Sequence, residues 1–296
     1  MNRVTVVVIT HNRRKELSCT LAHMTALPDR APIIVVDNGS IDGTADAVAR
    51  DHPEVELLRS PCNLGAVGRN VAVRRVRTPY VAFCDDDTRW EPGSLRHAAD
   101  LLDLHPRLAS VTGRCLVEPD LREDPITPEM RDSPVEGPDW LPGPALLGIM
   151  AGLSMLRVEA FREVGGFSPK LWLGGEEELL ALDLAVRGWW MCWAEDVVIR
   201  HAPSISRDAR ARRRDGIRNT LWTAWLRRPV SSALRHTGWV LRGAPKDRAT
   251  AAALGQALMG VPWVLGRRRV VPARVEHGLR RLEAARRGRT ARSYVG

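Results

Sequence analysis

The sequence predicts an α/β fold, a doubly wound and mainly parallel sheet followed by a C-terminal helical extension. Apolar runs alternate with helix-like segments and short loops over roughly the first 100 residues, which is typical of β-α-β units. Polar clusters follow these runs at the positions where such sheets bind ligands. From Arg207 onward the chain becomes basic and helical in its spacing.

The composition is ordinary for a soluble globular protein, with 44% hydrophobic and 27% charged residues in a chain of 296. The five cysteines are scattered without a C-x-x-C pair, so we expect reduced thiols rather than a disulfide framework or a zinc site. The opening run "VTVVVIT" is too short for a signal sequence, and no apolar run reaches membrane-spanning length. These features predict a cytoplasmic protein.

The first elements follow the β-α-β pattern. "VTVVVIT" (4–10) is apolar and largely β-branched, as in a strand buried on both faces. Residues 12–27 have helical spacing and end at Pro28. "PIIVVDNGS" (32–40) predicts a second buried strand with a polar turn, and residues 42–51 predict a short helix.

The alternation continues to the fourth strand. "VELLRS" (55–60) and "YVAFCDDD" (80–87) predict strands, and residues 63–76 between them predict a Gly-containing loop that runs into a helix. Residues 118–145 are rich in Pro and acidic side chains and predict a long loop. Such loops in compact domains often act as lids or binding loops.

Three further elements precede the extension. Residues 148–167 predict a strand and a helix closed by Gly165 and Gly166. Residues 171–189 predict a loop and a helix, and residues 191–201 predict a last strand.

Four polar clusters fall at the carboxyl ends of the first predicted strands or just beyond them. In doubly wound sheets ligands bind at this edge, where the strand order reverses. One polar strand end means little, but four on one edge predict a binding site. The clusters are Thr10-His11-Asn12, Asp37-Asn38-Gly39-Ser40, Asn63-Leu64-Gly65 and Asp85-Asp86-Asp87.

Three consecutive carboxylates, Asp85 to Asp87, close the fourth predicted strand. Unpaired, they repel and raise one another's pKa values, and a divalent cation would relieve that repulsion. Asp85 and Asp87 can reach one cation if the backbone turns at Asp86, and Mg²⁺ or Mn²⁺ commonly shares such oxygen ligands with a substrate diphosphate. The alternative is a solvated acidic turn.

Together these motifs resemble the family-2 glycosyltransferases, inverting enzymes of the GT-A fold that use nucleotide-sugar donors. "VVVITHNR" is similar to the opening strand and base-contacting turn of the family, and "IIVVDNGSIDGT" to its second strand, whose Asp reaches the nucleoside. "NLGAVGRN" resembles the N-x-G loop that ends in Arg-Asn, and "FCDDD" resembles the D-x-D metal motif. "GLSMLRVEAFREVGGF" and "GGEEELLALDLAVRGW" extend the similarity to residue 201.

The resemblance implies a division of the chain and a donor site. Residues 1–206 would form the GT-A catalytic domain, with a Rossmann-like nucleotide-sugar-binding half (1–100) and an acceptor-binding half (101–206), followed by the extension (207–296). The implied donor-binding residues are Thr10, His11, Asn12, Arg13, Asp37, Asn63, Gly65, Arg69, Asn70, Asp85 and Asp86. A helix N-terminus and an Arg side chain both attract phosphate, although a solvated Arg69 and a capping Asn70 remain the alternative.

The resemblance also implies a general base. The family carries it in a short acidic motif, usually Glu-Asp, before a helix, and "GGEEE" stands at this place. Glu176 and Glu177 align with the pair, so Glu177 would be the base in place of the usual Asp, with the choice among Glu176, Glu177 and Glu178 left open. The alternative is that these carboxylates only favour the helix macrodipole.

The implied metal ligands are Asp85, Asp87 and His201, with Mn²⁺ or Mg²⁺ as the cofactor. His201 closes the last predicted strand, and members of the family often carry a metal-binding His at this point. A neutral imidazole completes a mixed oxygen and nitrogen shell, which would favour Mn²⁺ over Mg²⁺. The alternative is an ordinary surface histidine.

The extension has a charge opposite to that of the rest of the chain. Residues 207–296 carry 22 Lys and Arg against 5 Asp and Glu, a surplus of positive charge that suits phosphate, anionic lipid or nucleic acid, or simply solvated Arg-rich helices. Residues 249–271 are mostly apolar and contain three consecutive Arg. This stretch predicts either peripheral contact with the inner face of an anionic membrane or a helix packed on the catalytic domain.

The function that the motifs favour is metal-dependent inverting transfer of a sugar from a UDP- or dTDP-sugar to an acceptor hydroxyl, by direct displacement with a carboxylate base. The acceptor is a glycan, a lipid-linked saccharide or a small molecule. A nucleotidyltransferase acting on sugar phosphates is the alternative, but "THNRRKE" lacks the Gly-rich loop usual after its first strand. A nucleic-acid-binding protein would leave the polar clusters without a role, so nucleic acid is not an expected partner.

Overall fold

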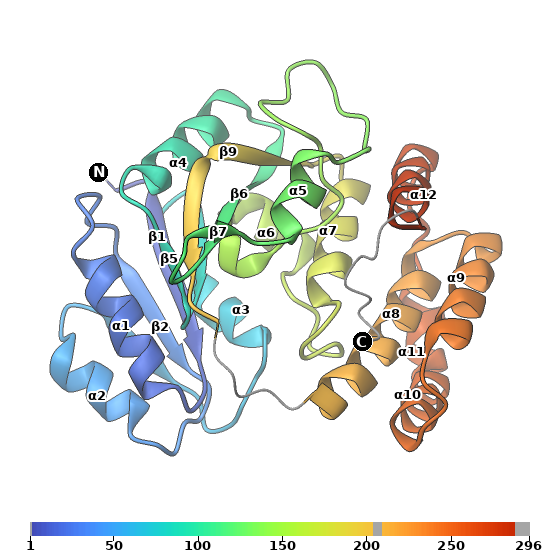
Figure 1. Cartoon of the computed structure of the whole chain (residues 1–296), viewed down its shortest axis with the longest axis horizontal. Coiled ribbons are helices and arrows are strands. Elements are labelled where there is room, and N and C mark those ends of the chain that lie inside the picture. The colour runs from blue at the N-terminus through green and yellow to red at the C-terminus, as the bar shows by residue number, and fades with distance from the viewer. Residues whose placement is uncertain (1, 204–208, 288–296) are drawn as a thin grey trace.

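The computed structural model describes residues 2–203 and 209–287. One nine-stranded sheet, in the order β3-β2-β1-β4-β8-β6-β9-β5 with β7 paired to β6, forms the centre of the molecule (Figure 1). The strands are β1 (Val4–Thr10), β2 (Ile33–Asp37), β3 (Glu56–Arg59), β4 (Tyr80–Asp85), β5 (Thr88–Trp90), β6 (Leu108–Val117), β7 (Arg122–Glu123), β8 (Ser154–Arg157) and β9 (Trp190–His201).

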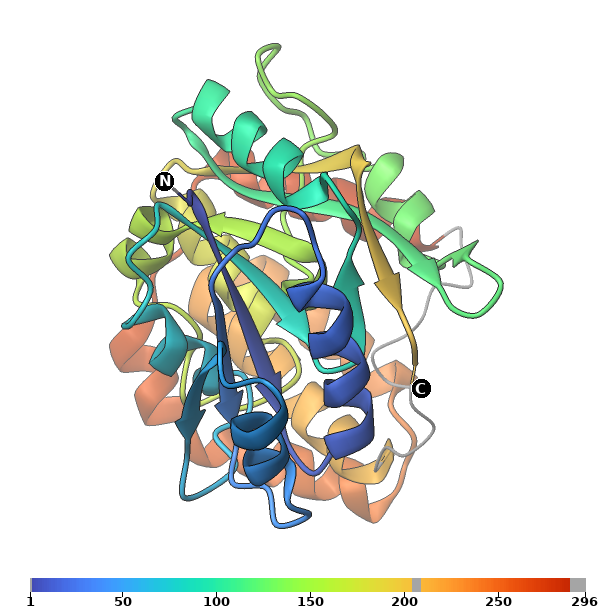
Figure 2. The ribbon, with the colours of Figure 1, turned by 90° about the vertical axis from the view of Figure 1, so that its left-hand side faces the viewer.

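Helices cover the sheet and continue into the extension. They are α1 (Arg14–Thr25), α2 (Thr44–Asp51), α3 (Val67–Val73), α4 (Ser94–Leu104), α5 (Ile126–Arg131), α6 (Val158–Val164), α7 (Glu176–Val186), α8 (Ala209–Arg227), α9 (Val230–Gly243), α10 (Arg248–Met259), α11 (Val261–Arg267) and α12 (Ala273–Arg287), with a 3-10 turn at Ala151–Leu153. Figure 2 views the sheet from the side of α1 and α2, with the extension behind it.

The first four strands form the parallel, doubly wound part of the sheet that the sequence predicts. Successive side chains of a strand point to opposite faces. Val6 and Val8 therefore enter the core beneath α1 and α4, whereas Val7 enters the core beneath α3, α6 and α7. Burial on both faces explains why these strands are apolar without alternation. The edge strand β3 is more exposed than β1, β2 and β4.

The second half of the sheet is mixed rather than parallel. β8 runs antiparallel between β4 and β6, and the long β9 runs parallel to β6. The end of β9 also pairs antiparallel with the short β5, which sets Thr88 opposite His201. This pairing brings the end of the last strand to the turn between β4 and β5.

Residues 118–145 are not a single loop. β7 pairs with the end of β6, and α5 begins after Pro125, whose fixed φ suits a helix start. The backbone N–H of Ile126 donates to Asp124 Oδ1 at 3.0 Å, and that of Cys115 donates to Thr127 Oγ1 at 3.2 Å. The Pro and Asp residues that predicted a loop therefore begin a short helix held against β6.

The extension packs on the rest of the chain through two apolar contacts. Leu226 and Val264 join Leu171 and Leu179 in one cluster, and α12 adds Val275 and other residues to the core beside α7. The predicted boundary at residues 206 and 207 lies outside the described residues. By length and composition, no helix in the described residues could cross a membrane alone, and α10 and α11 meet that test only as a pair bent by 50°.

Candidate active site

Three parallel strands end together at one edge of the sheet and carry predicted site residues there. Thr10 at the end of β1 pairs with Asp37 at the end of β2, and Ile9 pairs with Asp85 at the end of β4. The register of the sheet thus places the turns after β1, β2 and β4 side by side. This is the edge at which the sequence predicts a ligand site.

The acidic turn after β4 is neutralised in part by Arg13. Asp86 and Asp87 are both buried, and Arg13 Nη1 lies 2.9 Å from Asp86 Oδ1 and 2.8 Å from Asp87 Oδ2. Thr10 Oγ1 donates to Asp86 Oδ2 at 2.9 Å. Burial raises the pKa of Asp86 to about 7, against the opposing effect of the Arg13 charge. A solvated acidic turn is therefore the wrong interpretation.

Asp85 points toward a second arginine. Arg69 is buried, forms an ion pair with Asp85, and lies 5.8 Å and 5.6 Å from the ring centroids of Phe83 and Phe167. Arg69 is thus not the solvated side chain of the alternative interpretation. A Cβ on Gly152 would lie 2.6 Å from Asp85 Oδ2, so only glycine leaves that carboxylate oxygen its space.

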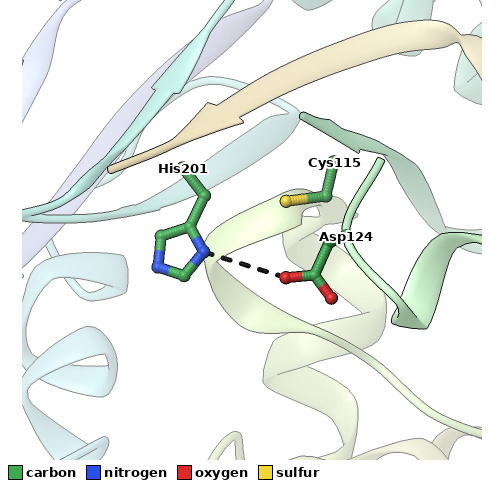
Figure 3. A group of neighbouring side chains, drawn as sticks. All are labelled: Cys115, Asp124 and His201. Atoms are coloured by element: carbon green, nitrogen blue, oxygen red, sulfur yellow. Dashed lines mark ion pairs between the residues drawn. The ribbon is translucent and has the colours of Figure 1, made fainter. Parts of the chain in front are cut away.

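His201 lies between two carboxylates. Its Nε2 is 3.8 Å from Asp87 Oδ1, and its Nδ1 is 4.0 Å from Asp124 Oδ2. Cys115 adds a thiol near the same ring (Figure 3). In the part of the chain that the structure describes, the three-ligand group with all atoms within 4.8 Å is Cys115, Asp124 and His201. The predicted trio with Asp85 and Asp87 does not form such a group, because Asp85 faces Arg69.

The three glutamates at the start of α7 differ in environment. Glu176 is buried, Glu177 is half-buried and Glu178 is exposed. Glu177 Oε1 accepts a hydrogen bond from the backbone N–H of Ala151. Burial, and secondarily the Glu176 charge, raises the pKa of Glu177 to about 8, and burial also raises the pKa of Glu176. Asp85 raises both pKa values and Arg69 lowers both, which ties these glutamates to the acidic turn.

The loop before α7 joins the donor-side loop to the extension. The backbone oxygen of Trp172 accepts from Ala66 N at 2.9 Å, and Trp172 Nε1 donates to the backbone oxygen of Asn63 at 3.1 Å. From α8, the fully buried Asn219 donates through Nδ2 to the backbone oxygens of Leu171 at 2.7 Å, Leu173 at 3.2 Å and Gly174 at 2.5 Å.

The remaining predicted donor residues stabilise the loops at this edge. His11 Nδ1 lies 2.9 Å from the backbone oxygen of Asn38, and Asn12 Oδ1 accepts from Ile41 N at 2.8 Å. Both side chains stay exposed. Further bonds of this kind are Ser40 N to Asp37 Oδ1 at 3.1 Å, Gly65 N to Asn63 Oδ1 at 2.9 Å and Asn70 Nδ2 to the Phe167 oxygen at 2.8 Å. Asn70 therefore binds the Phe167 backbone and does not cap a helix.

A sequence model described as Glycosyl transferase family 2 matches residues 5–165, more than half of the chain. The chain belongs to this family. The match runs from β1 through α6, so it includes Arg13, the Arg69 loop and the acidic turn. Family-2 membership identifies a glycosyltransferase, and the nucleotidyltransferase alternative is set aside.

Several known proteins are similar to this family-2 chain. The N-acetylglucosaminyl-diphospho-decaprenol L-rhamnosyltransferase of Mycobacterium tuberculosis is 27% identical over 273 residues, which cover 79% of this chain and 85% of the relative. The structure of S. aureus TarS 1–349 matches with a TM-score of 0.61 at 17% identity, covering 98% of this chain and 93% of that one. In a longer TarS chain the match spans 39% of its length, with 75% of this chain covered and a TM-score of 0.57.

A mannosyltransferase from Pyrobaculum calidifontis, solved with GDP-Man and Mn²⁺, matches with a TM-score of 0.57 at 21% identity. The match covers 98% of this chain and 76% of the mannosyltransferase chain. At such identities a structural match shows the fold alone, and the predicted GT-A fold with its helical C-terminal part is confirmed.

The structure adds three residues to this family-2 site that the sequence analysis missed. Gly152 makes room for Asp85, Asp124 faces His201, and Asn219 holds the loop before α7. Gly152 and Asp124 stand in segments predicted only as a strand region and a loop. Asn219 stands in a basic helix, where an amide carries no recognisable signal in the sequence.

Proposed function

We propose that this family-2 glycosyltransferase is a metal-dependent inverting enzyme. It would move a sugar from a UDP- or dTDP-sugar to a hydroxyl of a lipid-linked saccharide. The mycobacterial relative, by its name, transfers rhamnose to a decaprenol-linked acceptor, which supports this acceptor class. The observation that carries the proposal is Glu177, which is half-buried, is held by the N–H of Ala151 and has its pKa raised to about 8 by burial.

The residues around the acidic turn fit a divalent cation. Asp87 Oδ1 and His201 Nε2 are 3.8 Å apart, too far for a hydrogen bond and close enough for both to ligate one ion. Asp85, two residues earlier on the same turn, faces Arg69 and would have to turn from that ion pair to add a further oxygen, and the donor diphosphate would supply others. When bound, Mn²⁺ or Mg²⁺ would neutralise the charge of the departing diphosphate.

Glu177 is the best placed of the three glutamates to act as the base. Glu176 is too buried to meet an acceptor, and Glu178 faces solvent, whereas Glu177 is half-buried and fixed by the N–H of Ala151. A base whose pKa lies near the working pH transfers protons efficiently, and a pKa of about 8 meets that requirement.

The proposed reaction is a single displacement that needs no covalent intermediate. The acceptor oxygen forms a bond to the anomeric carbon from the side opposite the leaving group, and its proton passes to the Glu177 carboxylate. The bond between the anomeric carbon and the diphosphate oxygen breaks, and the nucleoside diphosphate leaves with that electron pair. One displacement inverts the anomeric configuration.

The first test is thermal stabilisation by nucleoside diphosphates with and without Mn²⁺. A ligand present at 100 times its Kd adds about 2.7 kcal/mol of stability, and such a gain raises the melting temperature by several degrees, at roughly 2–4 °C per kcal/mol. We expect UDP or dTDP to do so only with metal, and Asp87→Ala to abolish the shift. Absence of a shift with every nucleotide and metal would contradict the donor site.

The role of the base is tested by sugar transfer in matched variants. Glu177→Gln should lower kcat by about 10²- to 10⁴-fold while the nucleotide-induced melting shift persists. Glu178→Gln, one residue along the helix and exposed, serves as the control and should keep wild-type kcat. Equal losses in the two variants would contradict the assignment.

A further inference from the structure

Helices α10 and α11 expose an apolar surface, which we call the α10–α11 surface. Residues 249–266 contain no charged side chain. Leu258, Met259 and Leu265 are 71%, 76% and 64% exposed, and Val261 beside them is also exposed. An exposed patch of several large apolar side chains marks an interaction site more often than a random surface does.

The other side of these helices is fixed against the protein. Ala253 and Val264 are buried, and Trp222 Nε1 of α8 donates to the backbone oxygen of Ala257 at 3.0 Å. The rings of Trp222 and Trp263 meet edge to face with centroids 5.4 Å apart. Because one side of the pair packs on α8, the helices lie along the protein and only the α10–α11 surface is open.

Exposed cations stand at both ends of the apolar surface. Lys246 and Arg248 precede it, and Arg267 and Arg269 follow it. None of these four side chains forms an ion pair with another described residue.

The acidic side chains of the extension do not offset these cations. Each acidic residue in the described part of the extension pairs with arginines elsewhere: Asp215 with Arg214 and Arg218, Asp247 with Arg213, Glu276 with Arg228 and Arg280, and Glu283 with Arg228. The cations at the ends of the surface therefore keep their positive field.

We propose that the α10–α11 surface docks on an anionic lipid bilayer. Leu258, Met259 and Leu265 would enter the boundary between headgroups and acyl chains, and Arg248, Arg267 and neighbouring cations would contact lipid phosphates. A second copy of this chain would gain from the apolar contact but would bring like charges together. The charge therefore selects an anionic lipid surface over self-association.

Docking in this way would serve the active site. α8 contacts α10 and α11 on one side and α7 on the other, and Figure 1 shows it between α7 and the outer helices. Asn219 of α8 also holds the loop that leads to Glu177. A bilayer bound to α10 and α11 would thus lie on the side of the molecule where α8 contacts α7, the helix that begins with the three glutamates. This consequence rests on the proposed lipid-linked acceptor, whereas docking itself does not.

The test is flotation of the full chain with vesicles of phosphatidylcholine, with and without phosphatidylglycerol. We expect strong binding only with phosphatidylglycerol, weakened by salt. Leu258→Ser with Met259→Ser should reduce the partition coefficient at least tenfold, and Arg267→Gln with Arg269→Gln by about 25-fold, at about fivefold per cation. Leu104→Ser, an equally exposed position on α4, and Arg96→Gln serve as controls and should bind as wild type.

Several outcomes would overturn the proposal. These are equal binding to both vesicle types, no binding to either, and an equal loss in the Leu104→Ser control. A wild-type oligomer that Leu258→Ser with Met259→Ser converts to monomer, without vesicle binding, would assign the surface to a second copy instead. The UDP- and Mn²⁺-dependent melting shift is measured on each variant. In the wild-type chain, a normal shift with absent vesicle binding refutes docking alone, whereas an absent shift with intact vesicle binding refutes the donor site alone; in the surface variants, a normal shift beside weakened vesicle binding is the expected result.

Discussion

Replacing Asn219 by Ala should separate catalysis from donor binding. The Asn219 amide donates to three backbone oxygens in the loop before α7, and an amide nitrogen has two hydrogens for them. Each buried carbonyl left without a donor costs about 1–3 kcal/mol. Since two of the three bonds are only partly buried, we expect a loss of about 2 kcal/mol, concentrated in the residues that lead to Glu177.

The catalytic effect should exceed the effect on stability. Displacing a catalytic group by 1 Å costs on the order of 100-fold in rate, so kcat of Asn219→Ala should fall by 10- to 100-fold. The nucleotide-induced melting shift should persist, because the Asp87 and His201 pair lies on other elements.

Steady-state sugar transfer and the nucleotide-induced melting shift together check this expectation. Thr223→Val is the matched control, since Thr223 is buried one turn along α8 and its hydroxyl forms no hydrogen bond with any described residue. The control should keep wild-type kcat. An Asn219→Ala protein with a lower melting temperature but unchanged kcat would refute the reasoning, because α8 would then only stabilise the fold.

Four further outcomes are expected. Burial raises the pKa of Glu177 to about 8, so kcat/KM should increase with pH up to that value. The folded Glu177 carboxyl also holds its proton more tightly than the unfolded one. The melting temperature of the metal-free protein should therefore fall as pH rises from 4.5 to about 8, and it should fall less steeply in Glu177→Gln. Equal slopes in the wild type and the variant would contradict this. Asp124→Asn should weaken Mn²⁺ binding about 10- to 100-fold by calorimetry, because the carboxylate 4.0 Å from Nδ1 orients His201, and an unchanged affinity would argue against that role. Gly65 has φ +58, and a Cβ at this position would lie 2.5 Å from the Trp172 backbone oxygen, so the loop must move in Gly65→Ala. The rise in melting temperature caused by UDP should then be smaller. A rise equal to that of the wild type would show that the loop tolerates the side chain.

The sequence predicted an element correctly where the apolar pattern of its residues matches their burial in the structure. Runs such as that around Val7 are apolar on both faces because helices cover both faces of the sheet, so their composition alone indicates a central strand. The helix within residues 118–145 was missed because Pro125 and Asp124 favour a loop and a helix start equally well. Only the contact of Thr127 with β6 favours the helix.

The sequence predicted the place of the site because the carboxyl ends of neighbouring parallel strands meet at one edge of a sheet. Thr10, Asp37 and Asp85 could be placed at one edge from their positions after apolar runs. Their partners could not, because an ion pair such as that of Asp85 with Arg69 depends on side-chain direction and not on sequence spacing.

The sequence by itself determined the α/β class of this protein, the edge of the sheet that carries the site and the opposite charge of the extension, because these follow from periodicity and composition. The narrower GT-A class came from the resemblance of its motifs to family-2 glycosyltransferases. The tertiary structure decided which charges meet. It pairs Arg13 and Arg69 with the acidic turn, sets His201 between Asp87 and Asp124, and fixes the loop before Glu177 through Asn219. These contacts join residues far apart in the sequence, and Asp87 and His201 are separated by 114 positions. Such contacts depend on how β9 returns beside β5, and no local pattern encodes that return.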